Sequence, residues 1–535
     1  MAINKNILFI LEKFVRSDSV LQARDIFEAL PELKLTLRQV QTYIKAIKES
    51  SRITSIGAAV DTTYLAEPIQ KPYKKYRFIF VYKDNERAGL LVQRADDYLF
   101  IYDSSYLIDN LNPIPTLPFS LEPIQSNILF PIFEENLPEG VNKDIMEISM
   151  RKTNDLDKLA SLTHNIGDLH FSFSEKEMNT VENEGERQSY LANIDKILGT
   201  NTFPNILKEF SIELTEEEIF PEESELTAID QQDMSGISGF QYKKLMEIDY
   251  EKHQIFKDEL SRGYIFKPYS KIKATPNSKH YLPHLAINEH LFMTFAKNEL
   301  GFNVPESCLV KRDHDEEYHY LVKRFDRLGT QKYTKVTFAT FLGLVSETKY
   351  DTSSEKMFKR IKKELKSKEQ RMNLLKYYFY SMLIVHEDMH TKNLSLIFDG
   401  EITLLAPLYD ITTTSIYPYL KGYESHIPID GKRTNITPRC FKKLVTIMDI
   451  DYAAFKQEAS NIIKAYIEIL PKYFETINSM DSSSIVYKMK RKILRGTEEK
   501  FYKDTDEKEI SLSQLLLSKH TKRVEHLESL GWLSI

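Results

Sequence analysis

The most informative stretch of the chain is VHEDMHTKNLSLIFDGEITLLAPLYD, residues 385–410. Leu394 to Ile397 is a mostly apolar run that predicts a strand, and Asp399-Gly400 predicts a hairpin turn. The segment ITLLAPLYD then predicts a return strand ending at Asp410. Because a hairpin brings its two ends together, we expect Asp410 to lie close to Asn393, which precedes the first strand.

Side chains of this segment have the spacing that phosphoryl transfer requires. A carboxylate must accept the proton of the attacking hydroxyl, and hard oxygen ligands must hold Mg²⁺ beside the triphosphate of ATP. Asp388 is the candidate base, and Asn393, five residues later as in protein kinases, is a candidate magnesium ligand together with Asp410. Lys392 is a candidate to neutralise the charge that develops on the transferred phosphate.

Two histidines in the same segment suggest alternatives. His386 and His390 are four residues apart, a spacing that fits zinc on a helix. No further candidate ligand stands out nearby by spacing, so we rank zinc below the kinase interpretation. Either histidine is also compatible with a purely structural hydrogen bond, which is the favoured interpretation for His386.

A second part of the expected site lies upstream, in GYIFKPYS at residues 263–270. This segment predicts an apolar strand with one lysine, Lys267, whose ammonium needs a partner or a ligand because an unpaired buried charge is costly. In kinases such a lysine grips the α- and β-phosphates and pairs with a helix glutamate, and Glu289 in the predicted helix INEHLFMTFAKNEL is the natural partner. The alternative is a lysine that extends to solvent from a strand edge.

A small-residue loop, MSGISGFQYKK at residues 234–244, precedes this strand. Backbone amides of such a loop can cradle phosphates, although the loop lacks both the P-loop pattern and the usual kinase glycine pattern. A plain flexible turn is the default interpretation.

Composition indicates a soluble globular protein, 42% hydrophobic and 28% charged, and 535 residues predict several domains. The net charge of −6 argues against a chain devoted wholly to nucleic acid. Cys308 and Cys440 are too few for a disulfide framework or a zinc cluster. Charged residues interrupt the N-terminal apolar run, and no stretch is long enough to span a bilayer, so we expect a cytoplasmic protein without a membrane partner.

The first 70 residues predict a winged helix-turn-helix, with three short helices followed by the strand-like runs ITSIG and TTYLAE. Thr36 is the expected N-cap of the third helix, which runs from Leu37 to about Lys48 and buries one apolar face. Its outward side chains are of types that contact bases and phosphates. The candidate DNA-binding residues are Arg38, Gln39, Gln41, Thr42 and Lys45. A solvated helix face or a protein-contact module is the alternative.

The remaining segments predict a series of domains. Runs such as YRFIFVY and DYLFIYD predict a β-rich subdomain, and ELTEEEIFPEESE at 213–225 predicts an acidic solvated loop. The expected boundaries are 1–70 for the winged helix-turn-helix, 75–170 for the β-rich subdomain, 171–230 for an acidic connecting segment, 231–345 for a kinase N-lobe-like region, 346–500 for a helical C-lobe and 501–535 for a separate helical appendage.

The ordered series of motifs resembles the HipA family of serine/threonine kinases. The motifs are NLPEG (136–140), the loop at Gly239-Phe240-Gln241, YIFKP (264–268), the helix start NEH (288–290), LVKRFDR (321–327), EDMHTKN (387–393) and LAPLYD (405–410). The resemblance covers roughly residues 75–500. It implies an α+β fold, a two-lobed protein-kinase-like (HipA-like) architecture with an extra N-terminal β-rich subdomain, here preceded by the winged helix-turn-helix.

The resemblance also implies residue roles. It makes Lys267 the phosphate-gripping lysine, Val322, Lys323 and Phe325 part of the adenine-binding hinge, and Gly239 part of the phosphate loop. It supports Asp388 as the catalytic Asp, and Asn393 and Asp410 as Mg²⁺ ligands. Family members often autophosphorylate a serine in the glycine-containing loop. Gly236 stands where many have it, so Ser238 is the first candidate and Ser235 the second.

The resemblance implies a function as well: a toxin kinase of a bacterial type II toxin–antitoxin system that phosphorylates a translation component, such as an aminoacyl-tRNA synthetase, and causes growth arrest or persistence. The expected partners are ATP, Mg²⁺, a protein substrate and operator DNA bound through residues 1–70, while the fused domain leaves open whether a separate antitoxin exists. The alternatives are a DNA-binding regulator with a degenerate or nucleotide-sensing kinase body, and a kinase that acts on a small molecule.

Overall fold

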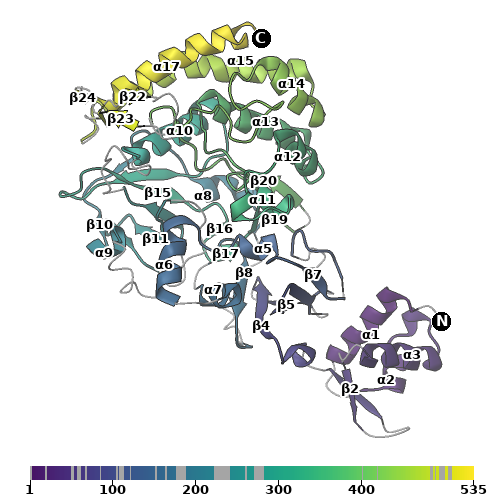
Figure 1. Cartoon of the computed structure of the whole chain (residues 1–535). Helices are drawn as coiled ribbons and strands as arrows, with labels where there is room; N and C mark the ends of the chain where they lie inside the picture. Colours follow the sequence, from purple (N-terminus) through teal and green to yellow (C-terminus); the bar gives the residue numbers. More distant parts are fainter. Residues whose placement is uncertain are drawn as a thin grey trace. The chain divides into compact units, whose positions relative to one another are not determined.

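The structure is a computed structural model (Figure 1). It describes residues 3–17, 21–49, 53–56, 62–66, 69–84, 86–103, 106–107, 114–120, 122–150, 154–162, 165–175, 188–221, 241–258, 262–269, 282–400, 402–417, 420–481, 486–487, 490–492, 501–503 and 509–535. The chain divides into two compact units. The first comprises residues 1–137, 150–182 and 232–234, and the second comprises residues 138–149, 183–231 and 235–535.

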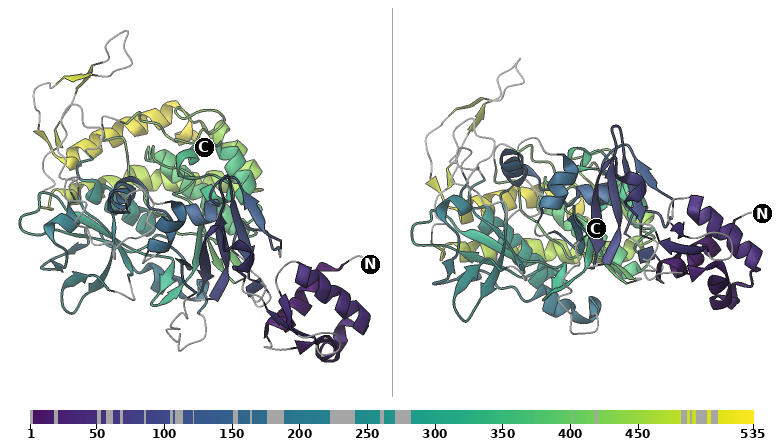
Figure 2. Two further views of the ribbon diagram at one scale, coloured as in Figure 1. Left: turned by 60° about the horizontal axis from the view of Figure 1, so that its bottom comes forward. Right: turned by 90° about the horizontal axis from the view of Figure 1, so that it is seen from below.

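The first unit begins with three helices and three short strands, the purple elements of Figure 2. Their bounds are α1 Lys5–Ser17, β1 Leu21–Gln22, α2 Ala23–Ala29, α3 Leu37–Glu49, β2 Ile53–Ile56 and β3 Thr63–Ala66. The strands form one antiparallel sheet in the order β1-β3-β2. The helix α3 and the hairpin agree with the sequence-based expectation, whereas β1 was not expected and delays the start of the second helix to Ala23.

The rest of the first unit is built on a five-stranded antiparallel sheet in the order β7-β6-β5-β4-β8. Its strands are β4 Arg77–Lys83, β5 Glu86–Gln93, β6 Tyr98–Tyr102, β7 Ile124–Ser126 and β8 Leu169–Ser172. Two short helices accompany them, α5 Pro131–Glu134 and α7 Asp155–Ser161. Gly89 in β5 is a close-approach position, because a Cβ there would lie 2.2 Å from the Ile101 carbonyl oxygen of the neighbouring strand.

The second unit contains a seven-stranded sheet in the order β10-β12-β11-β13-β15-β14-β9. Its strands are β9 Ile206–Leu207, β10 Ser211–Ile212, β11 Lys244–Asp249, β12 Gln254–Phe256, β13 Tyr264–Lys267, β14 Ser307–Val310 and β15 His319–Lys323. The helix α10, Leu285–Leu300, packs against β14 and β15 and is buried from Ala286 to Ala296. It ends at Gly301, whose positive φ of 65° allows its N–H to bond the Ala296 carbonyl.

The described part of residues 171–230 is not the acidic connecting segment that we predicted. Residues 188–221 supply β9 and β10, the two edge strands of the seven-stranded sheet, together with the short helices α8 Ile194–Leu198 and α9 Glu216–Ile219. Both edge strands pair in parallel with their neighbours. The acidic run also contributes buried apolar residues such as Ile219 to the core. The glutamates around these residues masked their apolar contribution in the sequence.

The C-terminal part of the second unit is mainly helical around a three-stranded sheet, β18-β19-β20. The strands are β18 Thr334–Thr337, β19 Ser395–Asp399 and β20 Ile402–Leu405. The helices are α11 Phe338–Phe341, α12 Ser354–Ile361, α13 Lys368–Leu383, α14 Pro438–Ile447, α15 Tyr452–Glu468, α16 Leu470–Ile477 and α17 Leu512–Ser529. The helix α6, Gly140–Met150, comes earlier in the chain and belongs to the second unit up to Ser149. Short paired strands complete it: β16 Arg327–Leu328 with β17 Gln331–Lys332, β21 Val486–Tyr487 with β24 Glu509–Ile510, and β22 Lys490–Lys492 with β23 Phe501–Lys503.

The helix α17 is part of the helical core rather than the separate appendage that we expected for residues 501–535. It packs against α16 and lies beside α15 in Figure 1. Arg523 is buried and donates to Glu424 (Nη1 to Oε1, 2.6 Å) and to the Met382 and Leu383 carbonyls at the end of α13. Trp532 is buried against Phe379, with ring centroids 4.9 Å apart. No helix in the described ranges is both long and apolar enough to cross a bilayer.

Candidate active site

The site starts from the end of the helix α13, which leads into the loop that carries the candidate base. Ser367 caps the start of α13, since its side chain accepts from the Glu369 and Gln370 N–H groups. Val385, just after the helix, has a positive φ of 58°, and turns the chain into the loop 386–394. Met389 of this loop is fully buried whereas Asp388 is exposed, so the candidate base faces solvent.

The predicted hairpin is present. Leu396 pairs with Leu405 and Asp399 pairs with Ile402. The return strand ends at Leu405, five residues before Asp410, so the expected strand is shorter than its apolar pattern suggested. The segments that flank the hairpin meet at Tyr409, whose hydroxyl donates to the Lys392 carbonyl at 2.7 Å. The immediate neighbours of Asn393 and Asp410 are therefore in contact.

Lys267 lies between two carboxylates. At the end of β13 its ammonium is 2.7 and 2.8 Å from the two carboxylate oxygens of Glu289 and 2.7 Å from Asp410 Oδ1. The ion pair expected with Glu289 is therefore formed, and Lys267 does not extend to solvent, since its side chain is 4% exposed. Asp410 has a positive φ of 57°, an uncommon conformation for a residue other than glycine that is often found at functional sites.

The electrostatics of this cluster keep its charges in place. Burial alone would raise the pKa of Asp410, but Lys267 and Lys243 hold it well below its usual range. Burial opposes the charge on Lys267, yet Asp410 and Glu289 raise its pKa. Burial raises the pKa of Glu289 to about 7, against the effect of Lys267. Asp410 is thus the anion that the site keeps ionised.

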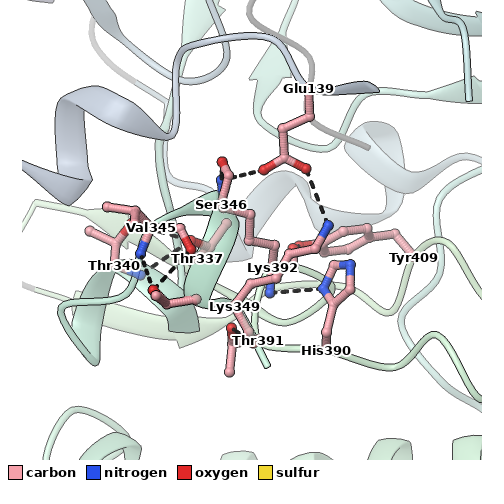
Figure 3. Close-up of polar contacts among 11 residues, drawn as sticks. Glu139, Thr337, Thr340, Val345, Ser346, Lys349, His390, Thr391, Lys392 and Tyr409 are labelled. Atoms are coloured by element: carbon pink, nitrogen blue, oxygen red, sulfur yellow. Dashed lines mark hydrogen bonds and ion pairs between the residues drawn. The ribbon is translucent and has the colours of Figure 1, made fainter. Parts of the chain in front are cut away.

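Lys392 is buried and does not face solvent. Its ammonium donates to Glu139 Oε1 at 2.6 Å and to Ser346 Oγ at 2.7 Å, and Figure 3 shows the Glu139 carboxylate facing it. Lys349 also pairs with Glu139, at 3.3 Å. Burial would raise the pKa of Glu139, but Lys392 and Lys349 hold it well below its usual range. The ordered NLPEG segment thus fixes a lysine of the candidate catalytic loop.

The two histidines of the loop have structural partners. His386 Nδ1 donates to the Thr412 carbonyl at 2.8 Å, and His390 Nδ1 accepts from the Lys392 N–H at 3.2 Å. Burial lowers the pKa of His390 to about 4, so the ring is neutral near pH 7. Among the described residues, no three side chains of His, Cys, Asp or Glu are grouped to hold a metal ion. Each ring thus has a hydrogen-bond partner within the protein, which agrees with the structural interpretation favoured for His386.

The expected hinge residues lie at the end of β15. Val322 is buried and pairs with Ile265 of β13, and the Lys323 ammonium donates to the Lys196 carbonyl at 2.9 Å. Phe325 packs against Tyr409, with ring centroids 5.2 Å apart. Because Tyr409 also bonds the Lys392 carbonyl, the hinge segment and the candidate catalytic loop share one packed aromatic residue.

Other expected residues have different outcomes. Gly239, Ser238, Ser235 and Gly236 lie within residues 222–240, outside the described residues. On α3, Arg38, Gln41, Thr42 and Lys45 are exposed, as expected. Gln39 is half-buried instead, and its side chain accepts from the Thr36 N–H at 2.7 Å, so it caps the helix.

Sequence reasoning missed three residues of the site. Lys243 is buried; burial lowers the pKa of its ammonium, and Asp410 opposes that effect. The Asn142 side chain holds the Lys243 backbone, because it accepts from the Lys243 N–H at 3.1 Å and donates to the Lys243 carbonyl at 3.0 Å. Glu139 was noted only within a motif. Tyr350 donates through its hydroxyl to Asp388 Oδ1 at 2.9 Å. Each of these contacts joins segments that are far apart in the sequence. Of the three residues, only Lys243, the lysine beside the small-residue loop, had a sequence signal that could have identified it.

Comparison with known proteins places this site in a family. Residues 79–171 match the HipA N-terminal domain, and residues 235–474 match the HipA-like C-terminal domain. Over these two regions the chain belongs to the HipA family. Together they cover more than half of the chain: the first contains Glu139 and Asn142, and the second contains Lys267, Glu289, Asp388, Asn393 and Asp410.

Individual relatives match shorter parts of this HipA-family chain. The putative kinase Y4dM of Sinorhizobium fredii is 32% identical over 149 residues, 26% of this chain and 36% of that protein. The putative kinase Y4mE of the same organism is 29% identical over 110 residues, 19% of this chain and 26% of that protein. The chain thus spans about a third of the first relative and about a quarter of the second.

A solved structure shares the fold. A chain of the complex of the Shewanella oneidensis MR-1 toxin–antitoxin system HipA, HipB and its operator DNA aligns with a TM-score of 0.54 at 18% identity. The alignment covers 85% of this chain and 98% of that chain. At this identity the likeness establishes the mixed α+β HipA fold and nothing finer.

Proposed function

We propose that the protein is an ATP- and Mg²⁺-dependent kinase that phosphorylates serine or threonine side chains of a protein. The observation that carries the proposal is the Lys267 ammonium, buried 2.7 Å from Glu289 and 2.7 Å from Asp410. A strand lysine paired with a helix glutamate is the arrangement by which kinases hold the α- and β-phosphates. Membership of the HipA family and two relatives described as putative kinases support the same class.

The oxygen groups near the hairpin suit Mg²⁺. Asp410 is kept ionised by the lysines, and Asn393 donates its Nδ2 to the Asp388 carbonyl at 3.1 Å, which leaves its Oδ1 to act as a ligand. Carboxylate and amide oxygens are the hard ligands that Mg²⁺ prefers. When bound there by Asn393 and Asp410, the ion would neutralise charge on the triphosphate.

The chain's own residues then divide the transfer among them. Lys267 binds and orients the phosphates, with Glu289 fixing its direction. The acceptor hydroxyl oxygen attacks the γ-phosphorus, its proton passes to the Asp388 carboxylate, and the bond from the γ-phosphorus to the ADP oxygen breaks. Asp388 is exposed, so a protein side chain can reach it.

The direct test is transfer of labelled γ-phosphate to protein by the full-length chain, with wild type compared with Asp388→Ala. We expect the substitution to reduce transfer by about 10²- to 10⁴-fold, because it removes the general base, while binding of ATP is retained. Lys5→Ala, an exposed lysine on α1, is a matched surface control that should leave transfer unchanged. Equal transfer by wild type and Asp388→Ala would refute the assigned base, and no transfer by the wild type would refute the kinase.

Membership of the HipA family supports a biological role as a toxin. We infer that expression arrests growth through phosphorylation of a translation component, such as an aminoacyl-tRNA synthetase. Comparison of phosphoproteomes from cells that express wild type or Asp388→Ala would identify the acceptor. Arrest that persists with Asp388→Ala would argue against phosphorylation as its cause, and a phosphorylated small molecule without phosphoprotein would favour the small-molecule alternative.

The N-terminal elements support a DNA-binding role. Three helices followed by the β2–β3 hairpin are arranged in the order of a winged helix-turn-helix, and α3 exposes Arg38, Gln41, Thr42 and Lys45. We infer that α3 enters the major groove of operator DNA upstream of the gene. Fluorescence anisotropy with that DNA should show weaker binding by Arg38→Ala and Lys45→Ala, with a salt slope reduced by about 1 for each lost phosphate contact. Unchanged binding by both variants would instead favour a protein-contact module, while DNA binding without any phosphotransfer would favour the regulator with a degenerate kinase body.

A further inference from the structure

The candidate base is exposed, so its carboxylate needs an external group to hold one orientation. Asp388 Oδ1 accepts a hydrogen bond of 2.9 Å from the Tyr350 hydroxyl, which belongs to the segment between α11 and α12. Tyr350 is 38 residues away in sequence, and no local pattern required this contact. A charge-assisted hydrogen bond of this kind restricts the carboxylate and leaves its second oxygen for another partner.

The Tyr350 ring itself packs against two histidine rings. The ring packs against the tilted ring of His426, with a centroid distance of 4.0 Å and an interplanar angle of 32°, and meets the His390 ring nearly edge-on at 5.2 Å and 80°. His390 is fixed in turn by the Lys392 N–H. The tyrosine therefore reaches Asp388 from a packed aromatic cluster, formed by Tyr350, His390 and His426.

The backbone beside Tyr350 is anchored as well. The Lys349 carbonyl accepts from Thr391 Oγ1 at 2.7 Å, and the Lys349 ammonium pairs with Glu139 at 3.3 Å. Figure 3 shows these residues around Lys392. The same glutamate that holds Lys392 thus also holds the segment that presents Tyr350.

We propose that Tyr350 is a positioning residue for the phosphotransfer: its hydroxyl holds Asp388 Oδ1, so that Oδ2 is directed toward the acceptor hydroxyl. This inference rests on the proposed kinase function. Tyr350 takes no part in bond making; the acceptor proton passes to Asp388, and ADP leaves. A base held in one orientation should raise kcat measurably, because displacement of a reacting group by a small distance lowers the rate.

The test uses full-length protein, Mg-ATP and myelin basic protein as a general acceptor, with Tyr350→Phe compared with wild type. Phenylalanine keeps the ring packing against His426 and removes the hydroxyl alone. We expect kcat to fall about 10-fold or more, while the dissociation constant of a non-hydrolysable ATP analogue with Mg²⁺ and the melting temperature stay unchanged. Tyr423→Phe is the matched control, since Tyr423 faces the same histidine edge-on at 6.1 Å without bonding Asp388, and should keep the wild-type kcat.

A double-substitution cycle separates action through Asp388 from other effects. In the Asp388→Asn background, Tyr350→Phe should cause no further loss of the residual rate. A kcat within twofold of wild type for Tyr350→Phe would overturn the inference while the kinase function stands. Equal losses of kcat, nucleotide affinity and melting temperature would assign the tyrosine a packing role and also overturn it, whereas an inactive wild type would overturn the kinase function and this inference together.

Discussion

Removal of the lysine between the two carboxylates should destabilise the second unit. Lys267→Met keeps an unbranched side chain but removes the charge 2.7 Å from both Glu289 and Asp410. Glu289 is only 2% exposed, and loss of one partner of a buried ion pair costs about 3–5 kcal/mol. Burial raises the pKa of Glu289 to about 7, so the carboxylate can take up a proton and limit the loss. We expect the lower end of the range, about 3 kcal/mol, at pH 8 and a smaller loss at pH 6.

The assay follows from the sequence, because the chain has one tryptophan. Trp532 is buried in the second unit, so its fluorescence in urea reports the unfolding of that unit. The double variant Lys267→Met, Glu289→Leu removes the ammonium and its more buried carboxylate partner, and leaves Asp410, whose side chain is 33% exposed. It should recover roughly half of the loss, since replacing a whole buried pair by apolar groups is often neutral but Asp410 still lacks its lysine. A single variant within about 1 kcal/mol of wild type, or a double variant no more stable than the single one, would refute the reasoning.

Two further predictions concern stability. Arg523→Met removes the partner of Glu424 at 2.6 Å; Glu424 is 2% exposed and keeps His526 at 3.5 Å. The loss of about 3–5 kcal/mol should lower the melting temperature of this large unit by about 5 °C, while its exposed neighbour Lys522→Met should leave it unchanged; a shift below about 2 °C would contradict the buried pair. Burial lowers the pKa of His290 to about 3, below the unfolded value of about 6.5, so the unfolded state binds the proton first and stability is lost as the pH falls below 6.5. We expect about 2 kcal/mol less stability at pH 5 than at pH 7 from this group, measured by urea unfolding, and a flatter pH dependence for His290→Gln. An unchanged slope in His290→Gln would contradict this assignment.

The sequence predicted those parts of the fold that local periodicity controls. Val40, Tyr43, Ile44 and Ile47 are buried on one face of α3, because a helical repeat places them together whatever lies opposite. The hairpin 395–405 was predictable from an apolar run and an Asp-Gly turn. By contrast, β9 and β10 are strands of two residues each, too short to produce a pattern, so the edges of the seven-stranded sheet were mistaken for a linker.

The candidate site divides in the same way. The candidates Lys267, Glu289, Asp388, Asn393 and Asp410 were selected from the sequence, because each stands at a fixed offset from a strand, a helix start or a turn, and the structure brings Lys267, Glu289 and Asp410 together. The directions of Lys392, Tyr350 and Arg523 were decided only by the tertiary structure, through partners 253, 38 and 99 residues away. Such contacts have no period in the sequence. They arise where buried charges and hydroxyls must find a partner once packing has removed water, and the partner is whichever group the fold brings within reach.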